Sequence, residues 1–161
     1  MTQRLLLTAT TVAVVAGSAI GTAPGAHATD WPTLNGTYSA VSDGQWSKTR
    51  DVYHDESTVN STWTITSDCS THSECSGHIV SDQGWSADAT FSFGLWLVER
   101  EVPNWEPCGD GTSAPGRQQF TFYPVGPTTL VGKDKTTGAS GACGISNWLT
   151  IEMPFRLTRI A

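Results

Sequence analysis

Basic residues are scarce in this sequence of 161 residues, which holds 9 Lys and Arg against 15 Asp and Glu and has a formal net charge of −6 at pH 7. The few positive charges are scattered rather than clustered. Binding to nucleic acid, or to an anionic membrane surface, depends on grouped Lys and Arg side chains. We therefore expect no nucleic-acid partner and no polybasic attachment to lipid.

Recognisable catalytic motifs are also missing. The sequence has no Gly-x-Ser-x-Gly, no His-Glu-x-x-His and no phosphate-binding glycine loop. We accordingly expect no cofactor, no metal and no enzymatic activity. The alternative is a secreted hydrolase that uses His54, Asp55 and Glu56, three polar residues that equally fit a solvated loop.

No cysteine precedes Cys69, and no charge occurs between Arg4 and Asp30. An apolar run rich in Leu, Val and Ala follows Arg4 and ends in Ala26-His27-Ala28, a pattern typical of a secretory signal peptide. A membrane anchor is the alternative, but Thr, Ser and Gly interrupt the run. We expect a signal peptide at 1–28 and a secreted β-domain at 29–161, with no lipid-accepting cysteine and no stable membrane insertion.

A convincing amphipathic helix is absent, because apolar and polar residues alternate instead. In residues 149–157, the even positions are Thr150, Glu152, Pro154 and Arg156. Successive side chains of a strand point to opposite faces, so this pattern predicts a strand with one face in the core. Pro154 lacks an N–H and should lie at an edge position or near a bulge. The predicted core positions are Leu149, Ile151, Met153, Phe155 and Leu157.

Seven further segments have strand-like patterns separated by turn residues, at 34–41, 58–66, 77–81, 85–91, 95–102, 118–123 and 129–132. Residues 45–55 are a polar strand or a long loop, and residues 103–111 are a long loop. Short strands joined in sequence, without repeats or linkers, predict a single all-β domain. We expect a lipocalin-like, up-and-down antiparallel β-barrel of about eight strands, with a β-sandwich as the alternative.

Four cysteines in an exported chain of this size are typical of two disulfides. Three pairings are possible. Cys69 and Cys75 close a short polar loop, which favours their pairing and leaves Cys108 to pair with Cys143. Zinc is the alternative, since Cys69, His72, Cys75 and His78 stand at three-residue intervals, although this is not the usual spacing of zinc ligands.

Seven tryptophans are many for a small acidic domain. Trp63, Trp85 and Trp96 lie in predicted strands, where filling the core is the ordinary role. The other four lie at strand ends or in loops. Such rings stack on sugars, line the mouth of a ligand cavity, or plug the end of a barrel. The candidate ligand-binding residues are Trp31, Trp46, Trp105 and Trp148.

Several short motifs together resemble a family of small secreted four-cysteine proteins of mycobacteria and related actinobacteria. They lie at residues 34–38, 75–81, 84–85, 105–111 and 119–124, with the late Cys143. The resemblance implies secretion and two disulfides, and it supplies no catalytic residue. A Gly-x-aromatic motif on the first strand, at Gly36 and Tyr38, is similar to lipocalin-type barrels, which usually carry tryptophan at the aromatic position.

The disulfides, the surplus of tryptophan and the missing catalytic motifs favour a secreted, monomeric binding domain. Its ligand would be a small apolar molecule, a glycan, or an extracellular or envelope protein.

The signal-peptide prediction has a direct test. N-terminal sequencing of the exported protein should begin near Thr29. Full-length chain retained in the membrane would contradict it.

Overall fold

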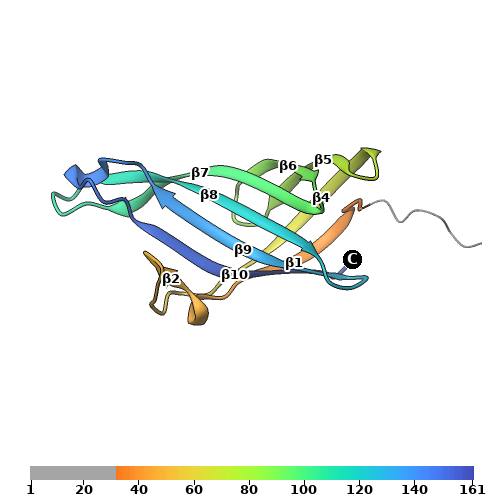
Figure 1. Ribbon diagram of the computed structural model, residues 1–161, viewed down its shortest axis with the longest axis horizontal. Helices are drawn as coiled ribbons and strands as arrows, with labels where there is room; N and C mark the ends of the chain where they lie inside the picture. The colour runs from red at the N-terminus through yellow and green to blue at the C-terminus, as the bar shows by residue number, and fades with distance from the viewer. Residues whose placement is uncertain (1–31) are drawn as a thin grey trace, which may run out of the picture.

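The computed structural model describes residues 32–161, which form a closed antiparallel β-barrel (Figure 1). Eight strands follow one another in the order β1-β4-β5-β6-β7-β8-β9-β10, and pairing of β10 with β1 closes the barrel. Two extra strands, β2 and β3, form a hairpin beside β10. The elements are β1 (Gly36–Ser42), η1 (Gly44–Trp46), β2 (Lys48–Thr49), β3 (Val52–Tyr53), β4 (Val59–Thr71), β5 (Glu74–Ser81), β6 (Ser86–Ser92), β7 (Leu95–Pro107), β8 (Ser113–Pro124), β9 (Thr129–Gly138), η2 (Ala142–Gly144) and β10 (Thr150–Arg159).

The predicted all-β class and up-and-down barrel are confirmed, and the sandwich alternative is wrong. The predicted signal peptide and Trp31 lie outside the described residues. Among residues 32–161, no helix has the length and apolar character needed to span a membrane. Residues 45–55, predicted as a polar strand or long loop, form η1 and the β2–β3 hairpin.

Aromatic side chains fill the barrel interior around Trp63, which is 1% exposed. Its ring centroid lies 5.0 Å from that of Phe120, 5.1 Å from that of Phe155 and 5.3 Å from that of Trp85. Edge-to-face and tilted contacts at this spacing are favourable for aromatic rings. Since these rings come from β4, β8, β10 and the β5–β6 turn, they connect opposite walls of the barrel.

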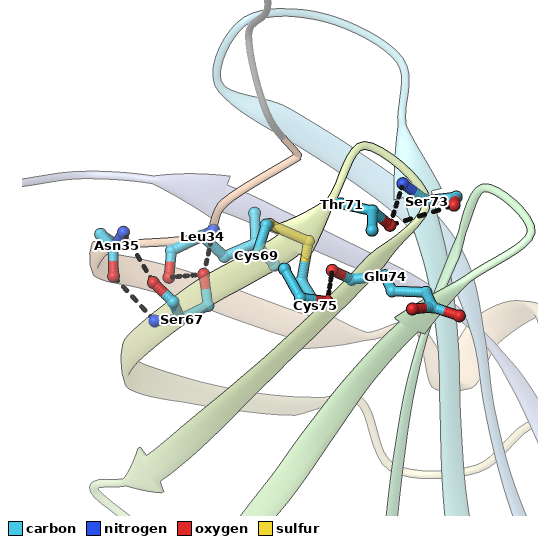
Figure 2. The surroundings of a disulfide bond; sticks show 9 residues. Leu34, Asn35, Ser67, Cys69, Thr71, Ser73, Glu74 and Cys75 are labelled. Atoms are coloured by element: carbon cyan, nitrogen blue, oxygen red, sulfur yellow. Dashed lines mark hydrogen bonds between the residues drawn. A yellow bond between two sulfur atoms is a disulfide. The ribbon is translucent and has the colours of Figure 1, made fainter.

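One end of the barrel is fastened by the disulfide between Cys69 and Cys75, which face each other across β4 and β5 (Figure 2). The segment entering β1 is held against β4 at the same place. Ser67 accepts a hydrogen bond from the Leu34 amide at 2.6 Å through its hydroxyl and donates its own amide to the Asn35 side chain at 2.8 Å. Because the two sulfurs are bonded to each other, Cys69 and Cys75 are not thiolate ligands for zinc.

Pro154 occupies a break in the barrel wall. On one side of β10, residues 155–159 pair with β1, and Ile151 and Glu152 pair with β2. Within the described part of the chain, the residues between these two ladders have no partner strand on that side. Pro154 therefore lies where no ladder hydrogen bond is required of its nitrogen, while its carbonyl accepts one from the Asp43 amide at 2.9 Å. The expectation of an edge-like position is confirmed.

The expectation for the core face of β10 is only partly right. Phe155 and Leu157 are buried, but Leu149, Ile151 and Met153 are half-buried. The reason is that β6 pairs with β7 only as far as Val98, so the wall opposite the start of β10 is missing.

This difference in burial predicts that alanine substitutions on the same face of β10 lower the free energy of unfolding by unequal amounts. Phe155→Ala should lower the free energy of unfolding by about 3–5 kcal/mol, because it leaves a cavity among packed rings. Ile151→Ala, at a half-buried position, should cost about 1 kcal/mol. Denaturant melts measure both. Equal losses would show that the start of β10 is packed as tightly as its end.

Candidate binding site

Strands β7, β8, β9 and β10 continue past the closed barrel as a four-stranded extension, here called the arm (Figure 1). Residues 103–111, predicted as a loop, mostly belong to it: β7 runs to Pro107, and Cys108 and Thr112 close a tight turn. Beyond Val98, β7 pairs only with β8 and, among the described residues, has a free edge on its other side. The missing N–H of Pro103 is tolerated in such an edge strand. The disulfide between Cys108 and Cys143 ties the tip of the arm to the loop before β10.

Trp105 covers the inner face of the arm. A shift of register between Val102 and Glu106 turns its ring over Gly116 and Gly138, which are paired on β8 and β9. A methyl group at Gly116 would lie 2.7 Å from the Trp105 ring, so only glycine leaves room for it. Trp105 is half-buried in this position.

Trp148 lies on the opposite face of the same sheet and is 53% exposed. It overhangs a groove of about 590 Å³, a volume within the range of small-molecule sites. The apolar lining of the groove includes Pro115 and Ala139, and the backbone of Gly116 and Gly138 contributes to it. Because Trp105 supports the inner side of these glycines, the strands beneath the groove are backed by a large ring.

Charged side chains also line this groove. Arg117 donates a hydrogen bond to Glu99 at 2.7 Å, and Glu99 also accepts one from Gln119 at 2.9 Å. Glu101 is the cross-strand partner of Arg117 and is exposed. The groove therefore combines one aromatic face with two carboxylates and a guanidinium. We call it the Trp148 groove.

Inside the barrel, at the base of the arm, a chain of polar side chains spans several strands. Arg100 donates to Gln118 at 2.7 Å, Gln118 donates to Asp134 at 2.8 Å, and Ser42 donates to the other oxygen of Asp134 at 2.7 Å. The Arg100 guanidinium also lies 4.5 Å from the centre of the Trp85 ring. These contacts satisfy polar groups in a mostly apolar interior.

Burial shifts the pKa values of the two charged groups in this hydrogen-bonded series, Asp134 and Arg100. It raises the pKa of the Asp134 carboxyl, although hydrogen bonds from Ser42 and Gln118 and the charge of Arg100 oppose the rise. Burial likewise lowers the pKa of Arg100, which the charge of Asp134 opposes.

The predicted ligand-binding tryptophans are not brought together at one point. Trp148 overhangs the groove and Trp105 lies on the far side of the same sheet. Trp46 is 64% exposed in η1, beside the β2–β3 hairpin. Glu99, Glu101 and Arg117 were not singled out from the sequence. The signal that could have found them is the alternation in β7 and β8, which puts these charges on the outer face.

The candidate hydrolase residues lie apart from the groove. His54 and Glu56 are 3.2 Å apart, but the His54 side chain is 68% exposed. The Glu56 carboxylate also accepts a hydrogen bond from Thr49 at 3.2 Å, and Asp55 is exposed. The nearby Ser47 hydroxyl donates to the His54 carbonyl rather than to its ring. This arrangement is typical of a hydrogen-bonded surface loop.

These features define a disulfide-stabilised β-barrel domain with an external groove. Its two disulfides indicate an oxidising, extracytoplasmic compartment.

Comparison with known proteins supports the fold. Neither the models of known protein families nor the curated proteins searched match the chain. Among solved structures, it is similar to the monomer form of the M. tuberculosis PknI sensor domain, with a TM-score of 0.61 and 18% sequence identity. The match covers 80% of this chain and 88% of that one. At this identity the likeness shows a shared fold alone.

The Asp134 carboxyl generates a pH prediction. Its pKa is raised on folding, so its contribution to stability is present below the ordinary carboxyl value of 3.8 and is lost as the pH rises through the higher folded value. The unfolding free energy of the wild type minus that of Asp134→Asn should therefore decrease between about pH 3 and pH 7.

The exposed Asp110 provides a contrast. Hydrogen bonds from Thr112 lower its pKa, so the same difference measured for Asp110→Asn should increase with pH. Urea melts at several pH values measure both slopes. An increase for Asp134 would mean that Arg100 outweighs burial.

Proposed function

We propose that this protein is a secreted binding domain that holds a carbohydrate in the Trp148 groove. The observation that carries the proposal is that the half-exposed indole of Trp148 lines a groove of about 590 Å³ together with the side chains of Glu99, Glu101 and Arg117. A sugar ring has apolar C–H faces that stack on an aromatic ring and hydroxyls that bind polar side chains. The groove offers both kinds of partner.

The chemistry of the groove separates a glycan from the other ligands considered. A carboxylate only accepts hydrogen bonds, so Glu101 suits a ligand with donors, as does Glu99 beyond the bonds it accepts from Arg117 and Gln119. The hydroxyls of a sugar donate to carboxylates and also accept from Arg117. A small apolar molecule would form no hydrogen bond with these charges, and packed rings already occupy the barrel centre around Trp63.

Two further observations support a binding role outside the cytoplasm. The disulfides are typical of exported proteins. A protein described as a sensor domain has the same fold, and sensing requires a binding surface.

The proposal predicts that Trp148→Ala weakens carbohydrate binding while leaving the fold intact. Calorimetric titration against neutral oligosaccharides (the cello-, chito- and malto- series) should find a ligand whose affinity falls at least about tenfold in the variant. Glu101→Gln keeps the size of the side chain and should weaken binding several-fold, because the amide is a weaker acceptor than the carboxylate.

Phe93→Ala provides a matched control. Phe93 is an aromatic residue in the β6–β7 turn that is 98% exposed and does not line the Trp148 groove. Its loss should leave the affinity unchanged. Equal binding by wild type and Trp148→Ala, or no binding of any neutral oligosaccharide by wild type, would refute the proposal.

A further inference from the structure

A second aromatic hollow lies on the outer side of β9, β10 and the β2–β3 hairpin. It encloses about 400 Å³ and is lined by Trp46, Lys48 and Tyr53 on the hairpin side. Lys133, Glu152 and Pro154 line it on the barrel side. Trp46, in η1, is 64% exposed and Tyr53, in β3, is 67% exposed, so two large aromatic rings face solvent here. We call this the hairpin hollow.

The hairpin, which carries Tyr53 and begins two residues after Trp46, is held in place. β2 pairs with β10, and the Arg50 amide donates to the Thr150 carbonyl at 2.9 Å. The Ser47 hydroxyl bonds the His54 carbonyl across the base of the hairpin, and Lys48 lies 5.0 Å from the centre of the Tyr53 ring. Exposed aromatic side chains on a fixed backbone lose little entropy on binding.

The two hollows share one face of the sheet. Thr137 lines the Trp148 groove and Lys133 lines the hairpin hollow, and both belong to β9. Residues four apart on a strand point to the same side and lie about 13 Å apart. Lys135, between them on that side, is the cross-strand partner of Glu152, which itself lines the hairpin hollow.

The same face continues toward the closed end of the barrel. A third hollow of about 400 Å³ is lined by Tyr123, Val131 and Arg156, and it shares Lys133 and Pro154 with the hairpin hollow. Tyr123 is exposed. Aromatic side chains thus recur along the outer side of β9, each beside charged groups.

We propose that this face binds an extended carbohydrate chain, whose successive sugars contact Trp148 and then Trp46 and Tyr53. The inference rests on the proposed function, since it assumes that the Trp148 groove takes a sugar. A single sugar in that groove leaves the rings of Trp46 and Tyr53 unused, whereas a linear chain along β9 reaches both places.

The charges on this face favour a glycan over a protein partner. The centres of protein interfaces are depleted in charged residues, because burying them without partners is costly. Here each hollow pairs its rings with charge: Arg117 with Glu99 at 2.7 Å, and Lys133 with Glu152 at 2.9 Å. A hydroxyl-rich chain bonds such groups while they remain hydrated.

A chain-length series tests the inference. The probes are the di- to hexasaccharides of the cello-, chito- and malto- series, titrated against the wild type, Trp148→Ala, the double variant Trp46→Ala/Tyr53→Ala and the Phe93→Ala control. Wild-type affinity should rise with chain length. The hairpin double variant should lose roughly tenfold in affinity for the hexasaccharide and none for the disaccharide. Trp148→Ala should weaken both.

Indole N–H signals of the unmodified protein give a second readout that needs no variant. The hexasaccharide should shift the signals of both Trp46 and Trp148, and the disaccharide should shift that of Trp148 alone. Equal wild-type affinity at all lengths, or an unshifted Trp46, would overturn the extended site and leave the proposed function standing. If Trp148→Ala changes binding at no length, the proposed function itself fails.

Discussion

The packing of aromatic rings around Trp63 is the constraint on which the rest of the molecule depends. Phe120, Phe155 and Trp85 approach it at centroid distances of 5.0 to 5.3 Å and connect opposite walls of the barrel. A small barrel filled in this way gains its stability from burial and has its interior volume occupied by its own side chains. The interior around Trp63 therefore has no room for a ligand, and the hollows described above lie on the outside.

The same need to cover apolar surface explains how the arm is packed. Where β6 stops pairing with β7, the sheet would expose its inner face, and Trp105 covers that face by lying over Gly116 and Gly138. The disulfide between Cys108 and Cys143 holds the tip. A sheet stiffened from behind presents a stable outer surface, which preorganises the Trp148 groove.

Much of the fold could be read from local patterns. The alternation around Phe155 and Trp63 marks their strands, and the position of Pro154 in a break of the ladder follows from its missing N–H. The candidate site was only partly predictable. Trp46 and Trp148 stood out as tryptophans near strand ends, but Arg117 and Glu101 are ordinary charges on a strand, and only cross-strand pairing brings them together.

The sequence by itself determined the class of protein, because side-chain periodicity, cysteine number and the scarcity of basic residues are properties of composition and order. Only the tertiary structure decided how the aromatic residues divide between core, cap and surface. Trp105 and Trp148 look alike in the sequence, yet the register of β7, β8 and β9 puts one ring behind the sheet and the other in front of it. The register shift in β7 between Val102 and Glu106 turns Trp105 toward the inner face, and the alternation of the sequence does not mark that irregularity.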